Sequence, residues 1–321
     1  MDTTVTLIVP VYNASEFLPK CLDSIRNQTL TEIQVLCVND GSTDGSLELL
    51  RRYASWDARF TVLDKPNEGA GPTRNYAYPH ITGRYVFFCD PDDWLERDML
   101  ETMVSFMEKE QADVLFFPWF VDETPVVLPE AGENPSRRWF LRETSCGSWG
   151  RLYQREFLLE RHLFFSRHRR GQDQIVFWRA CLEAEHPCFF PEPKYHYRKN
   201  LDVATVQKIK TRGIDIVDVH VGIRKYLEES GQFQEYKDIY YFRKLCELCV
   251  LSRSADRSIY REFLRRIQST LTPEEWTLLE NDQAGIPLDI TDFYLSLHPW
   301  KYAWKRLKIF YWFLRWNRGG R

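Results

Sequence analysis

Short apolar segments alternate with segments of helical periodicity along the first 120 residues. Apolar runs rich in β-branched and aromatic residues predict strands at residues 5–11, 33–39, 60–63, 85–89 and 114–120. Between these runs, apolar residues recur at the spacing of an amphipathic helix, at residues 17–27, 46–56, 71–78 and 98–109. Strands that alternate with helices form a mostly parallel sheet flanked by helices, so the sequence predicts an α/β fold.

The pattern becomes helical throughout after about residue 205. Helical spacing continues over residues 209–230, 234–251 and 258–271. An irregular connection is expected earlier, at residues 122–143, where Pro, Glu and Arg interrupt the alternation. We therefore expect an α/β domain of residues 1–207 and a helical C-terminal region of residues 208–321.

Composition excludes several classes of protein. The 321 residues are 44% hydrophobic, which is enough to build a substantial core. A net charge of -3 provides no general attraction to nucleic acid. The eight cysteines occur in a chain too large to need disulfides for stability, so we expect reduced thiols. Cys246 and Cys249 have the spacing of a redox or zinc pair but lack a second pair, and we interpret them as helix residues.

The chain offers no evident membrane-spanning or secretion signal. No apolar stretch approaches the ~18 residues that span a bilayer. The first predicted strand begins within a few residues of the N-terminus, which leaves no room for a signal peptide. We therefore expect a cytoplasmic protein.

Carboxylates follow the ends of predicted strands, where open α/β folds bind their ligands. Asp40 follows the second strand and could accept the N–H of a uracil-like base, or it could serve a turn and helix cap. Asp90 and Asp92 follow the strand at residues 85–89 in the run Asp-Pro-Asp-Asp. Such oxygen ligands suit Mg²⁺ or Mn²⁺ bound together with substrate phosphates. The alternative is a proline-containing turn in which Asp93 caps the next helix.

Further candidate residues lie in the second half of the predicted domain. Asp173 begins a predicted helix and could remove a proton from a hydroxyl nucleophile as a general base, or it could cap that helix. The basic run at residues 167–170 either closes on a diphosphate or an anionic acceptor, or remains a solvated loop. His196 lies between two tyrosines and is either a metal or diphosphate ligand or a structural histidine.

Taken together, these segments resemble the family-2 glycosyltransferases, which share the GT-A fold and invert the anomeric centre. The resemblance covers about residues 4–207 and is carried by Val9-Pro10-Val11-Tyr12-Asn13, residues 39–44, Asn67-Glu68-Gly69, Arg74-Asn75, residues 88–95, residues 148–158, Gln172-Asp173 and residues 195–198. It implies a nucleotide pocket that includes Pro10, Val11 and Tyr12, with Asp40 as the partner of the base and Arg74 as a contact to the nucleotide. It also implies that Asp90 faces the ribose and diphosphate, that Asp92 ligates the metal and that Asp173 is the catalytic base.

Two positions depart from the family pattern. Gln172 replaces the Glu that usually precedes the base, which removes a charge beside Asp173. Arg74-Asn75 is followed by Tyr76-Ala77-Tyr78 instead of a small glycine-containing turn, which bears on how Arg74 is placed.

The resemblance implies a metal-assisted, inverting transfer of a sugar from a nucleoside diphosphate sugar, with uridine as the nucleoside, to a hydroxyl of a glycan or lipid-linked acceptor. Two alternatives stand beside it. A nucleotidyltransferase would need a glycine-rich basic loop after the first strand, and residues 11–15 contain neither glycine nor lysine. A non-catalytic protein that binds nucleotide sugar or glycan would keep the fold and bind nucleotide without transferring sugar.

The C-terminal residues 298–318 mix basic residues with Trp and Tyr and contain no acidic residue. Such a segment suits a helix at an anionic membrane surface, with rings at the headgroup level and cations on the phosphates. This predicts a peripheral location at the inner face of the cell membrane. The alternative is a helix docked on the α/β domain or on a second subunit, which would make the protein a homo-oligomer.

Overall fold

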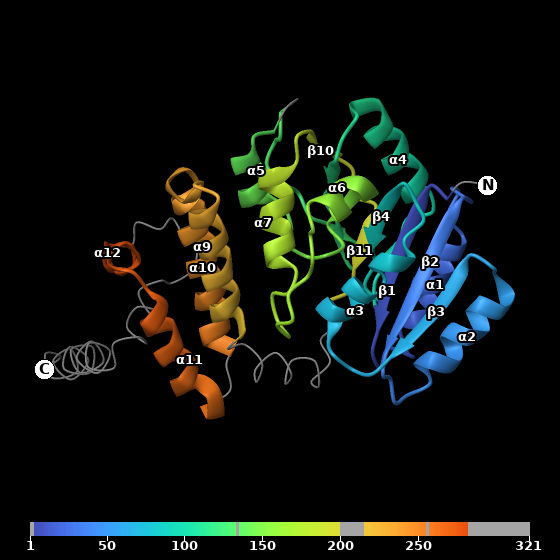
Figure 1. Cartoon of the computed structure of the whole chain (residues 1–321), viewed down its shortest axis with the longest axis horizontal. Coiled ribbons are helices and arrows are strands. Elements are labelled where there is room, and N and C mark those ends of the chain that lie inside the picture. The colour runs from blue at the N-terminus through green and yellow to red at the C-terminus, as the bar shows by residue number, and fades with distance from the viewer. Residues whose placement is uncertain (1–2, 133–134, 200–214, 255–256, 282–321) are drawn as a thin grey trace, which may run out of the picture. The chain divides into compact units, whose positions relative to one another are not determined.

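The computed structural model describes residues 3–132, 135–199, 215–254 and 257–281. The chain divides into two compact units, residues 1–201 and 202–321 (Figure 1). The domain change predicted near residue 207 falls among residues that lie outside the described ranges, so that boundary stays a prediction.

The first unit is built on a seven-stranded sheet with the strand order β10-β6-β9-β4-β1-β2-β3. Its strands are β1 (Val5–Val11), β2 (Ile33–Asp40), β3 (Phe60–Lys65), β4 (Tyr85–Phe88), β6 (Val114–Phe116), β9 (Arg151–Gln154) and β10 (Pro187–Phe189). The neighbouring strands pair in parallel except at β9, which is antiparallel to both β4 and β6. The predicted mostly parallel α/β sheet is confirmed.

Helices cover both faces of this sheet, and successive strand residues point to opposite faces. One face packs on α1 (Leu18–Arg26), α2 (Ser46–Trp56) and α4 (Met99–Glu110), and Phe87 of β4 belongs to this core. On the other face, Phe88 contacts the ring of Phe165 edge-on at 4.8 Å. The other helices of the unit are α3 (Ala70–Tyr76), the short 3-10 helix η1 (Tyr78–His80), α5 (Arg137–Glu143), α6 (Arg155–Glu160) and α7 (Gln174–Glu183). Because both faces are covered, every residue of β1 is buried, which explains its continuous apolar run.

A second, four-stranded sheet was not predicted from the sequence. It consists, in spatial order, of β5 (Trp94–Leu95), β11 (Tyr195–Tyr197), β7 (Phe120–Val121) and β8 (Thr124–Pro125). The strand predicted at residues 114–120 is wrong beyond Phe116, because Pro118 has no N–H to donate to a ladder. The connection predicted to be irregular at residues 122–143 contains β8 and α5, whose N-cap Ser136 accepts a hydrogen bond from the backbone N–H of Trp139.

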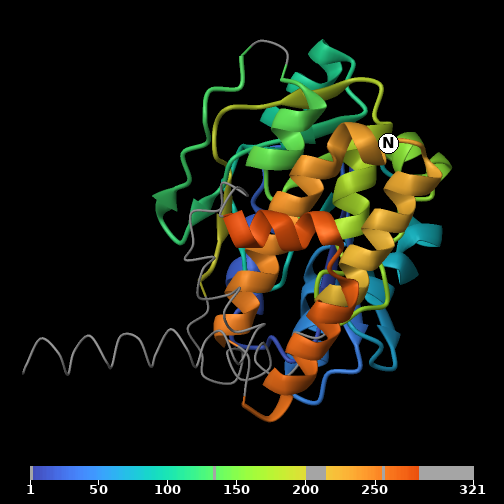
Figure 2. The same ribbon diagram turned by 90° about the vertical axis from the view of Figure 1, so that its left-hand side faces the viewer.

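The second unit is helical in its described part, as predicted. It contains α9 (Asp215–Glu229), α10 (Phe233–Ser254), α11 (Arg257–Thr270) and α12 (Pro273–Asn281). The first three of these helices contact one another (Figures 1 and 2). Cys246 and Cys249 lie on α10, as predicted. The seven cysteines whose side chains are described are all free thiols, in agreement with the expectation of reduced cysteines.

The helix α12 was not predicted, although the sequence contains its start signal. Thr272 and Glu275 form a capping box, in which each backbone N–H donates to the side chain of the other residue. None of the helices in the described ranges combines the length and apolar character needed to cross a membrane. The basic aromatic segment at residues 298–318 lies outside the described residues.

A buried ion pair connects α10 to α12, and we expect it to be important for the stability of the second unit. Lys244 Nζ lies 2.8 Å from Glu275 Oε1, and both side chains are almost completely buried. Lys244→Met should destabilise the protein by about 3 kcal/mol or more, because it leaves a buried carboxylate without a counter-charge. The double variant Lys244→Met/Glu275→Gln keeps an acceptor for the capping box and should recover much of that loss in urea unfolding. Equal losses in the two variants would contradict this role.

Candidate active site

The predicted site residues gather at one edge of the seven-stranded sheet. Parallel strands end at the same edge, so the ends of β2 and β4 bring Asp40 and Asp90 to it. Strand β9 is antiparallel and therefore begins at this edge, with Arg151 paired to Phe116. The edge thus collects residues that are far apart in the sequence, as expected for the ligand crevice of an open α/β sheet.

The Asp40 carboxylate is almost fully buried and organises the turn that follows β3. Its Oδ1 accepts hydrogen bonds from Lys65 Nζ at 2.8 Å and from the Glu68 N–H at 2.9 Å, and its Oδ2 accepts from the Gly69 N–H at 2.9 Å. Burial acts to raise the pKa of Asp40, but these donors outweigh it and the pKa lies below its ordinary value. The contact between Asp40 and a nucleotide base stays a prediction.

The loops after β1 and β2 are bound to each other beside the candidate nucleotide pocket. Asp44 accepts hydrogen bonds from the N–H groups of Ser15 and Ser46, which lower its pKa to about 2 even though burial opposes them. Pro10 and Val11 are buried within β1. Tyr12 is 45% exposed, so it alone of these three has an accessible side chain, and its contact with a nucleotide stays a prediction.

Arg74 of α3 is the cation at the centre of the edge. Its side chain is 3% exposed, and Nη2 donates to Asp90 Oδ1 at 2.5 Å. The guanidinium also lies over the ring of Phe165, 5.2 Å from its centroid. Among the described residues, Nε and Nη1 of Arg74 have no hydrogen-bond partner. Buried donors are normally satisfied, so these two N–H groups suit the oxygens of an anionic ligand.

Asp92 and Asp93 follow Asp90 but have different environments. The pKa of Asp92 is raised to about 6, first by burial and then by the charge of Asp90. Burial and then the charges of Asp90 and Asp92 raise the pKa of Asp93 to about 9, and its carboxyl group accepts hydrogen bonds from the Tyr195 hydroxyl at 2.5 Å and from the Arg198 N–H at 2.8 Å. Asp93 therefore fixes β11 beside the loop, whereas the N-cap of α4 is Asp98.

His196 of β11 is held on all sides by the protein. Its Nε2 lies 2.6 Å from Glu96 Oε1, and its Nδ1 lies 2.8 Å from the carbonyl oxygen of Asp122. Its ring is stacked between Trp94 and Phe120, at centroid distances of 4.8 and 4.4 Å. Both nitrogens are thus occupied in this arrangement, which favours the structural alternative for His196 over the metal-ligand one.

Asp173 immediately precedes α7 but makes no side-chain capping hydrogen bond. Its pKa is raised to about 6, first by burial, while the charges of Arg74 and Arg151 act in the opposite direction and that of Asp90 raises it further. The carboxyl group is therefore close enough to the Arg74–Asp90 ion pair for both charges to affect its pKa. A carboxylate that is buried and uncommitted to a cap, with a raised pKa, has the properties of a general base.

Arg151 was not singled out from the sequence, yet it is a second fully buried cation whose charge lowers the pKa of Asp173. Its guanidinium donates to the Tyr153 hydroxyl at 2.6 Å and to the carbonyl oxygens of Ser145 and Gly147, both at 2.8 Å. A charged residue within an apolar strand is the signal that could have identified it, because a fully buried arginine requires such partners.

A second interaction that the sequence did not identify as functional anchors the loop that leads to Asp173. Asn75 Nδ2 donates to the Phe165 carbonyl at 2.8 Å, and its Oδ1 accepts from the Phe165 N–H at 2.9 Å. A Cβ at Gly71 would lie 2.1 Å from the Ser166 carbonyl oxygen, so this close approach requires glycine. The basic run at residues 167–170 lies between this anchor and Asp173, and whether it closes on a ligand stays a prediction.

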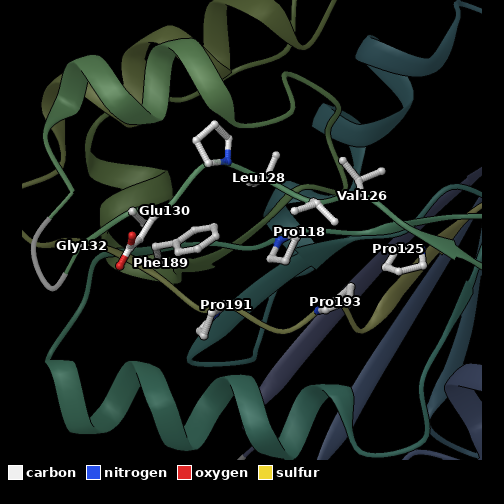
Figure 3. Close-up of a pocket in the computed structure, with 12 residues that line it drawn as sticks. Pro118, Pro125, Val126, Leu128, Glu130, Gly132, Phe189, Pro191 and Pro193 are labelled. Atoms are coloured by element: carbon white, nitrogen blue, oxygen red, sulfur yellow. The ribbon is translucent and has the colours of Figure 1, made fainter.

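A separate cavity of about 530 Å³ lies elsewhere in the first unit. Its lining is mostly apolar and includes Pro118, Leu128, Phe189, Pro191 and Pro193, whose side chains gather around the cavity in Figure 3. None of the predicted site residues belongs to this lining.

The fold and the carboxylate-lined edge define a GT-A glycosyltransferase, and the comparisons identify its family. The model for "Glycosyl transferase family 2" matches residues 6–171. The chain belongs to this family and is a glycosyltransferase, which sets aside the nucleotidyltransferase and non-catalytic alternatives.

Relatives and solved structures agree with this assignment. EpsH of Bacillus subtilis, provisionally named as a glycosyltransferase, is 29% identical over 83% of both chains. Glycosyltransferase GlyA of Streptococcus pneumoniae is 28% identical over 86% of this chain and 42% of its own length. TarS of S. aureus, solved in complex with UDP-GlcNAc, aligns over 94% of this chain and 92% of that chain with a TM-score of 0.57 and 16% identity, which supports the fold alone.

We expect Asn75→Ala to reduce sugar-nucleotide turnover by about 10²-fold with little effect on nucleotide binding, because a small displacement of a catalytic group is that costly. Asn75→Asp keeps the acceptor for the Phe165 N–H but loses the donor, and it should give an intermediate rate. Steady-state kinetics and calorimetric titration with the nucleoside diphosphate measure the two effects. Full turnover in Asn75→Ala would show that the anchor does not position Asp173.

Proposed function

We propose that this enzyme transfers one sugar from a UDP-sugar to a hydroxyl of a glycan or lipid-linked acceptor, with inversion and with the help of Mn²⁺ or Mg²⁺. One observation carries the proposal: Asp92 and Asp173 both have a pKa near 6 and both experience the charges of Arg74 and Asp90. Two buried carboxyl groups that are influenced by the same ion pair suit a metal ligand and a base that act on the same substrate.

The choice of donor and acceptor is supported by the proteins that this chain resembles. TarS was solved with UDP and with UDP-GlcNAc. A relative that is 32% identical over 114 residues is named poly(ribitol-phosphate) beta-glucosyltransferase. We infer from these names that uridine is the nucleoside and that the product belongs to polysaccharide biosynthesis at the cell envelope.

The residues present fit a divalent cation that is held partly by the protein and partly by the phosphate oxygens of the donor. Asp92 supplies a carboxylate, and Asp90 is partly committed to Arg74. In the described part of the chain, no three acidic, His or Cys side chains gather as a metal cluster, so the other ligands would be phosphate oxygens and water. A metal bound there would neutralise charge on the departing diphosphate. His196 is not included in the proposed site.

The protein side of the mechanism follows from the two arginines. Arg74 would direct its two unpartnered N–H groups to the diphosphate of the donor. Asp173 would accept the proton of the acceptor hydroxyl as that oxygen attacks the anomeric carbon opposite the diphosphate. Burial raises the pKa of Asp173 and makes it a stronger base, while Arg74 and Arg151 keep it ionised at neutral pH.

The C-terminal segment at residues 298–318 completes the proposal. Its cations and aromatic residues would hold the enzyme at the anionic inner face of the membrane, beside a lipid-linked acceptor.

We expect Asp92→Asn to remove the effect of metal on donor binding. A ligand at about 100 times its Kd stabilises the folded state by about 2.7 kcal/mol, so UDP with Mn²⁺ should raise the melting temperature of the parent more than UDP alone. This extra increase should disappear in Asp92→Asn and persist in Asp98→Asn, which changes a half-exposed carboxylate at the N-cap of α4. An undiminished metal effect in Asp92→Asn would show that the ion binds elsewhere.

The pH profile of kcat/KM should have an acidic limb near pH 6, about two units above the ordinary pKa of Asp, because protonation of Asp173 removes the base.

Asp173→Asn should lower turnover by about 10²-fold or more at neutral pH while UDP binding persists. A raised pKa favours the protonated folded state, and this contribution is lost as the pH rises through about 6. Asp173→Asn should therefore not lower stability at pH 7. Parent-like turnover in this variant would rule Asp173 out.

A further inference from the structure

An aromatic stack extends to the protein surface from the loop at residues 90–93, which is called the carboxylate loop below. Trp149 lies parallel to Tyr195 at a centroid distance of 4.9 Å and an angle of 7°. Tyr197 also stacks on Trp149, at 5.6 Å and 27°. Trp119 contacts the same indole edge-on at 5.3 Å. The stack is rigid because its members belong to or precede strands.

Hydrogen bonds fix Tyr195, the inner end of this stack, to the carboxylate loop. The Tyr195 hydroxyl donates to Asp93 Oδ2 and accepts from the Asp90 N–H at 3.3 Å. At the outer end, Tyr197 is 38% exposed, whereas Trp149 is 6% exposed. Among the described residues, Trp149 is the only ring stacked on Tyr197. The outermost ring thus offers apolar surface at a fixed position relative to Asp90.

The position of the stack along the sheet edge separates it from the nucleotide. The residues proposed to bind the nucleotide, such as Tyr12 and Asp40, lie at the ends of β1 and β2, on one side of β4. Trp149 lies two residues before β9, which is on the other side of β4. Burial and then the charges of Asp93, Asp92 and Asp90 raise the pKa of Tyr197, whereas Arg170, three residues before Asp173, lowers it. The backbone N–H of the next residue, Arg198, donates to Asp93 Oδ1 at 2.8 Å, so Tyr197 lies beside the carboxylate loop.

We propose that Tyr197, supported by Trp149, is the stacking platform for a pyranose ring of the acceptor. The acceptor hydroxyl attacks the anomeric carbon from the side opposite the diphosphate, so we place the acceptor beside the carboxylate loop and away from β1 and β2, where Tyr197 is exposed. The apolar C–H face of a pyranose complements the negative face of an aromatic ring. Binding sites of this kind combine aromatic surface with a few polar groups. The inference rests on the proposed function and specifies a sugar, not a bare alkyl or polyol chain, next to the attacking hydroxyl.

Saturation-transfer NMR on the full chain tests this platform. The probes are the methyl glycosides of glucose, galactose and N-acetylglucosamine, with UDP and Mn²⁺ saturating the donor site. At least one glycoside should bind to the parent, with saturation strongest at the C–H groups of one ring face. Tyr197→Ala should weaken that binding by about tenfold, and Tyr197→Phe should keep it within about twofold, because the ring and not the hydroxyl makes the contact.

Control variants separate the platform from general damage. Tyr197→Leu keeps apolar bulk without a ring and should lose binding as Tyr197→Ala does. Trp56→Ala removes an aromatic side chain that is 60% exposed on α2 and should bind like the parent. UDP affinity should be unchanged in all four variants, and a parent that binds no UDP would contradict the proposed function instead of the platform.

Three results would overturn the inference. One is parent-like glycoside affinity in Tyr197→Ala. Another is the absence of glycoside binding to a parent that does bind UDP. The third is glycoside binding that is displaced by a UDP-sugar but not by UDP alone. The pyranose ring of the glycoside would then occupy the position of the donor sugar.

Discussion

The ion pair between Arg74 and Asp90 is the interaction on which the rest of the site depends. A guanidinium that is 3% exposed requires anions around it, and Asp90 supplies only one hydrogen-bond partner. The remaining N–H groups leave room for a second anion, for which the donor diphosphate is suited. Asp92 and Asp173 take their electrostatic environment from the same pair. In the proposed mechanism, one buried cation would thus bring the leaving group, the metal ligand and the base together.

Burial gives the carboxylates of this edge different properties, according to the donors that each of them finds. Asp40 and Asp44 accept several hydrogen bonds and keep pKa values below the ordinary value. At Asp92 and Asp173, burial outweighs the effect of nearby hydrogen bonds and positive charges, and it raises their pKa values to about 6. The first pair therefore stabilises loops as permanent anions, whereas the second pair can exchange a proton or a ligand near neutral pH. Residue type alone does not distinguish the two pairs.

The sequence was sufficient for those parts of the fold in which local pattern and tertiary environment agree. The alternation up to residue 116 predicted the parallel strands closely, because strands buried on both faces are apolar throughout. It did not predict β9 as an antiparallel strand or the small second sheet, since two-residue strands such as β5 have no periodicity to detect. At the site, motif positions predicted Asp92 as a metal ligand and Asp173 as the base, and these roles stay predictions. The roles of Asn75 and Arg151 depend on contacts with Phe165 and Ser145, which no sequence spacing predicts.

The antiparallel strand explains how this edge can hold two substrates. A parallel strand brings only the residues that follow it to the ligand edge, and β1, β2 and β4 contribute Tyr12, Asp40 and Asp90 in this way. Because β9 runs in the opposite direction, it brings the residues that precede it, including Trp149, to the same edge. Reversal of one strand next to β4 therefore adds a second, aromatic set of side chains beside the carboxylates. In the proposed mechanism, one set would hold the anomeric carbon of the donor and the other set would hold the hydroxyl that attacks it.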